Sequence, residues 1–235
     1  MTDGLRGHAL VLGDGDPPRR DDLDAAWPGW DDDVSIVVAA DGGARLAAAL
    51  GLEVAEWAGD GDSLSGDELE ALRSKGVAIQ LAAVAKDESD LELAVLRALR
   101  PGVARISILG ARRGPRLDHE LANVFLLAHP AFSGGASVQI VDPRARVSLL
   151  AAPDARGERA SRVLTGRVGD IVSLVPLDAE VAGIETTGLR YPLRDEPLVL
   201  GPARGLSNVR TTEAATVSAT SGRLLIVETP ANLGG

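Results

Sequence analysis

The chain has 235 residues, 45% of them hydrophobic and 25% charged, which suits one large or two small globular domains. Its net charge of −10 and aromatic content of 3% disfavour a nucleic-acid-binding surface, and the absence of cysteine excludes disulfides and thiolate metal sites. No apolar run reaches the ~18 residues of a membrane span, and the first residues lack a signal-peptide pattern. We therefore expect a cytoplasmic protein.

Short apolar segments alternate with helical patterns over residues 1–150. Strands are predicted at residues 8–12, 34–39, 54–58, 77–83, 104–109 and 137–141. Helices are predicted at 44–50, 68–74, 90–100 and from His119 to just before Pro130. Most of these strands are continuously apolar, as expected when both faces of a sheet are covered. The pattern predicts an α/β domain with a Rossmann-like parallel sheet and helices on both faces.

Beyond residue 150 the sequence changes to short β-type segments separated by turn residues, without a convincing helical pattern. Strands are predicted at residues 170–175, 181–185, 189–193, 215–219 and 224–228. This spacing is typical of an all-β sandwich. We therefore predict an α/β catalytic domain over residues 1–150 and a β-sandwich for substrate binding and dimerisation over residues 151–235, joined by the polar segment 151–161.

Acidic or glycine-rich turns follow several strands of the predicted parallel sheet. They lie at residues 13–16, 41–43, 59–63, 86–90 and 110–119. Because the strands of such a sheet run in one direction, these turns gather at one edge, where open α/β sheets bind ligands. Carboxylates at that edge would repel a polyphosphate unless a divalent cation lay between them.

The turn 59–63 places Asp60 and Asp62 two residues apart, a spacing that lets both reach one Mg²⁺. An ordinary polar turn is the alternative. Ser89 followed by Glu92 is a capping-box pattern and predicts a helix that begins at Asp90. Acids there either stabilise the helix dipole or offer a carboxylate to a metal.

Two further turns offer groups for an anion. The pair Gly42 and Gly43 allows close approach of the backbone to a ligand, although a tight turn explains it equally well. Arg116 and its neighbouring arginines could neutralise phosphate, whereas Asp118 can be read as a helix cap. The usual P-loop, dinucleotide-binding and hydrolase-elbow motifs are absent, and the three histidines lack metal-ligand spacing.

Taken in order, these turns resemble the thiamine pyrophosphokinase family. Its motifs D-G-G-A, G-D-x-D-S, D-x-[ST]-D and G-x-R-x-D-H, with a following Asn, stand here at 41–44, 59–63, 87–90, 114–119 and 123. Segments 188–193 and 205–208 resemble signatures of the family's β-domain. Gly61 stands where the family usually has Phe, and Pro115 where Gly is common.

The resemblance implies a homodimer with active sites at the subunit interface, in which the hydroxyl of thiamine attacks the β-phosphorus of ATP and AMP leaves. It implies Mg²⁺ as cofactor, held by Asp60, Asp62 and Asp90. Lys86 and Arg116 are candidates for stabilising charge on the transferred group. Asp118 or Asp90 would orient the hydroxyl. The residues expected around the substrates are Asp41, Gly42, Gly43, Ser63, Ser89, His119, Asn123, Ser207 and Asn208.

Two other functions remain open from the sequence. One keeps the chemistry and changes the acceptor to another heterocyclic alcohol such as hydroxymethylpterin. The other is a non-catalytic nucleotide-binding module with the same fold.

Overall fold

The computed structural model describes residues 7–83, 86–112, 116–133, 135–152 and 159–231. The chain forms two compact units, Met1–Pro143 and Arg144–Gly235. The division falls earlier than the predicted boundary at residue 150 because strand β7 (Ala145–Ala152) pairs antiparallel with β14 (Gly222–Thr229), so it belongs to the second unit. No described helix is long and apolar enough to cross a membrane.

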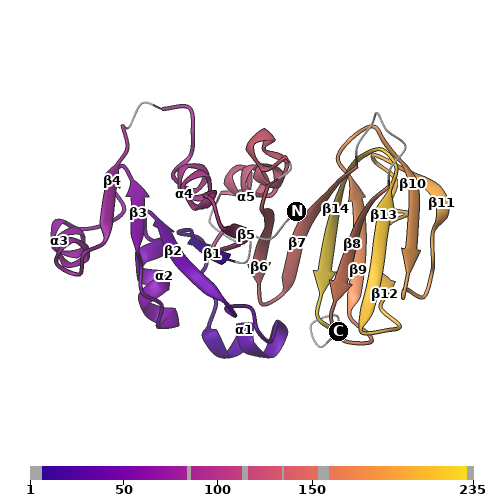
Figure 1. Ribbon diagram of the computed structural model, residues 1–235, viewed down its shortest axis with the longest axis horizontal. Helices are drawn as coiled ribbons and strands as arrows, with labels where there is room; N and C mark the ends of the chain where they lie inside the picture. The colour runs from indigo at the N-terminus through magenta and orange to yellow at the C-terminus, as the bar shows by residue number, and fades with distance from the viewer. Residues whose placement is uncertain (1–6, 84–85, 113–115, 134, 153–158, 232–235) are drawn as a thin grey trace. The chain divides into compact units, whose positions relative to one another are not determined.

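The first unit is a parallel sheet with helices on both faces, which confirms the predicted α/β class. Its strands are β1 (Gly7–Leu12), β2 (Val34–Ala40), β3 (Glu56–Gly59), β4 (Ala78–Leu81), β5 (Val103–Leu109) and β6 (Ser137–Asp142). Its helices are α1 (Arg20–Ala26), α2 (Gly43–Leu50), α3 (Gly66–Ser74), α4 (Asp90–Ala98) and α5 (Leu117–Phe125), followed by the 3₁₀ turns η1 (Leu126–Ala128) and η2 (Pro130–Phe132). Helices α1 and α2 lie on one side of the sheet, and α4 and α5 on the other (Figure 1).

The strand order within this unit is β6-β5-β1-β2-β3-β4, and every neighbouring pair is parallel. The chain therefore builds outwards from β1 in one direction, and then crosses over through α4 to build β5 and β6 on the other side. The loops after β1 and β5 lead to helices on opposite sides of the sheet, and they touch at this reversal, where the N–H groups of Gly13 and Gly15 donate to the carbonyls of Leu109 and Gly110 at 2.8 and 2.7 Å. Such a reversal is where open α/β sheets form a ligand crevice, at the carboxyl ends of the strands.

Two local predictions in the first unit differ from the structure. Helix α1 was not predicted, because it has only seven residues and no side-chain cap; burial of Leu23 and Ala26 stabilises it instead. Helix α5 begins at Leu117 rather than at His119, so Arg116 occupies the N-cap position and Asp118 is inside the first turn. The alternative interpretation of Asp118 as a helix cap is therefore wrong.

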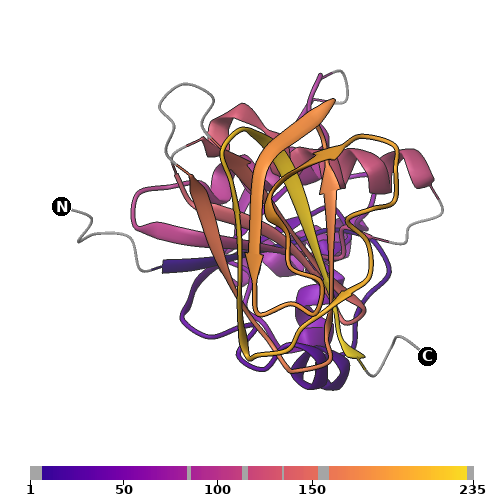
Figure 2. The same ribbon diagram turned by 90° about the vertical axis from the view of Figure 1, so that its right-hand side faces the viewer.

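The second unit is a sandwich of two antiparallel sheets, as predicted. One sheet has the order β12-β9-β14-β7 and the other β11-β10-β13-β8 (orange to yellow in Figure 2). Its other strands are β8 (Ala160–Thr165), β9 (Ile171–Pro176), β10 (Glu180–Thr187), β11 (Arg194–Val199), β12 (Asn208–Val209) and β13 (Ala214–Ala219). Apolar side chains from both sheets, among them Val172, Ile184, Val217 and Leu224, form one buried cluster between them.

The predicted strand at residues 189–193 is wrong. Only Leu189 forms a bridge there, to Arg210, and the strand of this region begins at Arg194. The reason is a side chain: Asn208 hydrogen-bonds both the N–H and the carbonyl of Tyr191, so the segment bends around it. Strands β7, β8, β11 and β12 were not predicted.

Candidate active site

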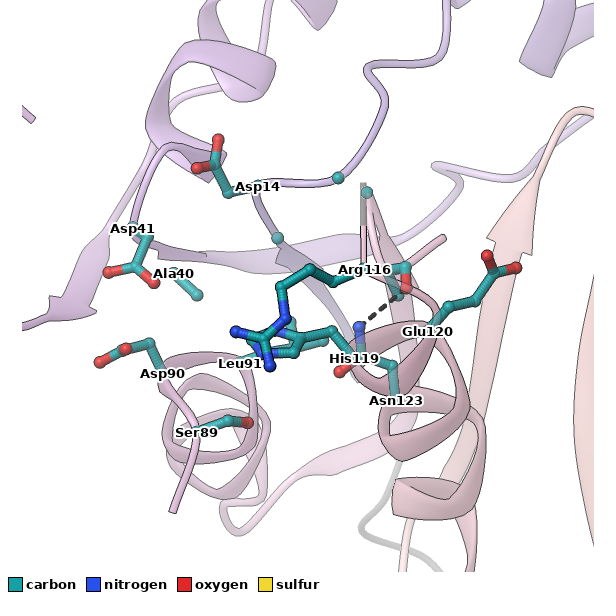
Figure 3. A pocket seen from close by; sticks show the side chains of 14 residues that line it. Asp14, Ala40, Asp41, Ser89, Asp90, Leu91, Arg116, His119, Glu120 and Asn123 are labelled. Carbon is teal, nitrogen blue, oxygen red and sulfur yellow. Dashed lines mark hydrogen bonds between the residues drawn. The ribbon is translucent and has the colours of Figure 1, made fainter. Parts of the chain in front are cut away.

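A pocket of about 320 Å³ opens at the carboxyl ends of β1, β2 and β5, where the strand order reverses (Figure 3). The start of α4 and one face of α5 complete its walls. Its lining residues are Gly13, Asp14, Gly15, Ala40, Asp41, Ser89, Asp90, Leu91, Gly110, Ala111, Arg116, His119, Glu120 and Asn123. All of them belong to the first unit. The pocket therefore has an acidic side at β1, β2 and α4, and a side at α5 that carries Arg116, His119 and Asn123.

Three carboxylates gather beside this pocket. Asp41 follows β2, and Asp60 and Asp62 follow β3; one oxygen of each lies within 4.8 Å of the other two. The turn after β3 is folded by its own side chains, because Asp60 Oδ1 accepts from the N–H of Asp62 at 3.0 Å. The hydroxyl of Ser63 donates to Asp62 Oδ1 at 3.1 Å. Acidic turns that are distant in sequence thus meet at one sheet edge.

Asp41 is the most perturbed member of this group. Burial, followed by the charges of Asp90 and Asp60, raises the pKa of its carboxyl to about 7. Its Oδ1 is buried and has no hydrogen-bond partner among the described residues. A buried carboxylate oxygen without a donor, beside two further carboxylates, fits a divalent cation, which prefers such hard oxygen ligands. We refer to Asp41, Asp60 and Asp62 as the acid cluster.

Asp90, predicted as a metal ligand, lies at the edge of the acid cluster. Its carboxylate faces that of Asp41 (Figure 3) and is ion-paired with Lys86. Ser89 is the N-cap of α4, as predicted, and its side chain accepts from the N–H of Glu92 at 3.1 Å. This cap fixes the first turn of α4 and with it the position of Asp90. Asp41 is thus a candidate ligand together with Asp60 and Asp62, and Asp90 lies beside them.

The opposite side of the pocket carries a cation and an amide. The guanidinium of Arg116 points across the pocket toward α4 (Figure 3), while its Nε and one terminal nitrogen donate to Asp118 at 3.1 and 2.5 Å. This pairing lowers the pKa of Asp118 to about 2. Asn123 donates to the carbonyl of Ala111 at 2.8 Å and so holds the loop after β5. His119 lines the pocket and is exposed.

The glycines after Asp41 have a packing role in the structure. A Cβ at Gly42 would overlap the carboxylate of Asp14, and one at Gly43 would overlap the carbonyl of Leu12. These glycines therefore let the loop after β1 approach the loop after β2. Gly114 and Pro115, which form part of the predicted arginine motif, lie outside the described residues.

Ser207 and Asn208 lie in the second unit and are not part of the pocket lining. The amide of Asn208 is occupied by the backbone of Tyr191, at 3.0 Å to the N–H and 2.7 Å to the carbonyl. The N–H of Ser207 donates to Ser173 Oγ at 3.0 Å. Within this unit, both residues hold loops together.

Sequence reasoning left Asp14, Leu91 and Glu120 out of the site, although all three line the pocket. For Asp14 there was a signal, since it follows directly after the first predicted strand in an acidic turn. Leu91 and Glu120 gave none, because their place depends on how α4 and α5 pack on the sheet.

Comparison with known proteins assigns both units. The family model described as thiamin pyrophosphokinase, catalytic domain, matches residues 30–139, and the one described as thiamin pyrophosphokinase, vitamin B1 binding domain, matches residues 162–224. A thiamine pyrophosphokinase of Bacillus subtilis is 24% identical over 199 residues, which cover 85% of this chain and 89% of the relative.

Solved structures show the same fold. The crystal structure of thiamine pyrophosphokinase from Bacillus subtilis superposes with a TM-score of 0.76 at 21% identity and covers 96% of this chain and 99% of its own. The crystal structure of thiamin pyrophosphokinase from Geobacillus thermodenitrificans superposes with a TM-score of 0.73 at 25% identity, and the match covers 95% of this chain and 97% of that one. Since models of both domains of one family match the two units in order, the chain belongs to the thiamin pyrophosphokinase family.

Proposed function

We propose that this protein transfers a pyrophosphoryl group from ATP to the hydroxyl of thiamine, giving thiamine diphosphate and AMP, with Mg²⁺ as cofactor. The observation that carries the proposal is the acid cluster beside a pocket at the strand-order reversal. Family membership supports the acceptor and the group transferred. The two substrates are metabolites of the cell interior, in keeping with the expected cytoplasmic location.

In this reaction the hydroxyl oxygen of thiamine forms a bond to the β-phosphorus of ATP, and the hydroxyl proton is released to water. The bond from that phosphorus to the oxygen bridging it to the α-phosphorus breaks, and AMP leaves with that oxygen. A bound Mg²⁺ would neutralise charge on the polyphosphate, and Asp41, Asp60 and Asp62 would hold it, with Asp90 close by. The protein's task is to position the reactants and to stabilise charge.

The cations of the site suit this task from two sides. Arg116 crosses the pocket from α5, and Lys86 lies beside Asp90 at the start of α4. We propose that these two residues stabilise the negative charge that develops on the transferred group and on AMP. Asp90 lines the pocket, whereas Asp118 is not among its lining residues. We therefore assign the orientation of the thiamine hydroxyl to Asp90.

We further propose that the protein is a homodimer. Helix α5 has an apolar stripe in which Leu117, Leu121 and Phe125 are 70%, 47% and 54% exposed. These residues lie at i, i+4 and i+8, so they form one continuous stripe on the helix next to the pocket residues of α5. A second copy that covers the stripe would remove this apolar surface from water. Sedimentation velocity should give a dimer, and substitution of Leu121 by Glu should give a monomer.

The direct test is incubation of the purified protein with ATP, Mg²⁺ and thiamine, followed by chromatography of AMP and thiamine diphosphate. We expect equal amounts of both products, and no turnover when EDTA removes divalent cations. AMP release with hydroxymethylpterin but not with thiamine would mean that the pterin alcohol, and not thiamine, is the acceptor. ATP binding without AMP release from any alcohol would make the protein a non-catalytic nucleotide-binding module.

A further inference from the structure

The indole of Trp57 lies directly behind the acid cluster. Trp57 is a fully buried residue of β3, and its Nε1 donates to the carbonyl of Asp41 at 2.8 Å. The next residue of the strand, Ala58, accepts from the N–H of Asp41 at 3.1 Å. Consecutive residues of β3 thus hold both backbone polar groups of Asp41, one residue beyond the end of β2.

This restraint matters because the backbone of Asp41 is strained. Its φ of +49° is in the left-handed region, which costs a residue with a side chain about 1 kcal/mol. Gly42 and Gly43 follow, and neither has a side chain to limit rotation of the adjoining peptides. The indole N–H is therefore a specific restraint on the orientation of the Asp41 carbonyl.

The side chain of Asp41 is restrained at the same place. A Cβ added at Gly59 would overlap Asp41 Oδ1 and would also lie within 2.9 Å of ring atoms of Trp57. Asp41 Oδ1 and the edge of the indole ring thus both border the bare backbone of Gly59. Trp57 contributes to both restraints, since it holds the carbonyl of Asp41 and lines the space in which its carboxylate sits.

We propose that Trp57 is a positioning residue for the carboxylate of Asp41 and thereby sets the affinity of the acid cluster for a divalent cation. The inference rests on the metal site of the proposed function but not on the identity of the acceptor. Partners that orient a metal ligand from behind change metal affinity by about 10- to 100-fold when they are removed. Loss of the indole N–H should therefore weaken metal binding by a similar factor.

The chain provides matched controls in its two other tryptophans. Trp27 donates from Nε1 to the carbonyl of Asp142 at 2.8 Å, the same kind of bond at the same distance. Trp30 donates to Asp24 Oδ1 at 2.8 Å. Both belong to a different buried cluster of the first unit than Trp57 does. Trp57→Phe and Trp27→Phe thus remove the same N–H and a similar volume, and only the first removal is next to the acid cluster.

The test measures Mn²⁺ binding by electron paramagnetic resonance, without ATP or thiamine, together with the melting temperature of each variant. We expect Trp57→Phe to bind Mn²⁺ at least about 10-fold more weakly than Trp27→Phe, with similar losses of melting temperature. Equal Mn²⁺ affinities of the two variants within about twofold would overturn the inference, as would absence of Mn²⁺ binding by the unsubstituted protein. If the unsubstituted protein binds Mn²⁺ but forms no thiamine diphosphate, the proposed function is wrong. The inference about Trp57 is then still decided by the Mn²⁺ affinities of the two variants.

A second measurement covers the case in which Trp57→Phe does not fold. The three tryptophans give three indole N–H signals in a ¹H–¹⁵N spectrum, and Trp27→Phe and Trp30→Phe assign them. Titration of the unsubstituted protein with Mg²⁺ should shift the Trp57 signal and leave the other two in place. A Trp57 signal that stays in place while Mg²⁺ binds would overturn the inference.

Discussion

Two charge clusters, one in each unit, are built in opposite ways. In the second unit, Arg210 and Arg146 hold the two carboxylate oxygens of Glu228 at 2.6 and 2.9 Å, and the side chains of Arg210 and Glu228 are 0% and 3% exposed. In the first unit, the carboxylates of Asp41, Asp60 and Asp62 lie within 4.8 Å of one another. One cluster pairs opposite charges, and the other brings like charges together.

The difference separates a cluster that supports the fold from one that we propose binds a cation. Buried charges that hold a fold together must be neutralised inside the protein, because an unpaired buried charge costs several kcal/mol. Like charges held together destabilise the empty protein, and a bound cation would convert that repulsion into affinity. Carboxylates crowded by a strained backbone and an indole therefore indicate a site whose missing charge comes from a ligand.

The largest effect that we expect is on activity, from Asp62→Asn. The substitution removes one charge from the acid cluster, so the rate of AMP formation should fall at least ~100-fold. Because Asp62 is exposed in a turn, the free energy of unfolding should change by less than ~0.5 kcal/mol. The control is Asp67→Asn, at an exposed acid of α3 outside the cluster. Near-normal activity of Asp62→Asn would show that Asp62 is not a metal ligand.

Glu228→Gln tests the other cluster, through stability. It leaves the buried guanidinium of Arg210 without its charged partner, which should lower the free energy of unfolding by about 3–5 kcal/mol in urea titrations. Asp178→Asn is the matched control, because Asp178 pairs with Arg223 where both side chains are far more exposed. That variant should lose less than ~1 kcal/mol. Equal losses would mean that burial does not distinguish the two pairs.

Asp41→Asn should make the metal-free protein more stable at pH 8. A carboxyl whose pKa rises from 3.8 to about 7 on folding contributes stability that is complete below pH ~4 and is lost as pH rises through ~7. The amide has no such loss, so the variant should gain ~1 kcal/mol over the unsubstituted protein at pH 8, with the difference vanishing near pH 4. Thermal unfolding in EDTA at the two pH values measures it. Equal stability at pH 8 would show that neither burial nor the neighbouring carboxylates raise the pKa of Asp41 in the folded protein.

The sequence predicted the sheet edge but not the geometry of Asp41. Local composition identifies the apolar strands and the acidic turns that follow them. Because parallel strands run in one direction, these turns must lie at the same edge of the sheet, so the position of the site could be inferred. The left-handed backbone of Asp41 and the hydrogen bond from Trp57 depend on how β2 and β3 pair. No spacing within either segment encodes that contact.

In the second unit, the sequence predicted the class and missed several strands. The wrong strand at residues 189–193 has suitable apolar residues, but Asn208 binds its backbone from 17 positions away. Glu228 and Arg210 also look like ordinary surface residues, because their pairing joins β14 to the residue that follows β12, 18 positions away. Alternation and turn residues therefore identify a sandwich, whereas the side-chain bonds between distant segments remain hidden.

The smallest effect that we expect is from Asp118→Asn, which breaks an exposed ion pair at the mouth of the pocket. The side chains of Arg116 and Asp118 are 62% and 64% exposed, so water and salt screen their attraction. In urea titrations the free energy of unfolding should fall only slightly at low salt and by less still at high salt. Arg116→Gln breaks the same pair from the other side and should give the same small loss. A loss as large as that of Glu228→Gln in either variant would mean that this pair, like that of Glu228, supports the fold, and that Arg116 is not free to turn to a phosphate.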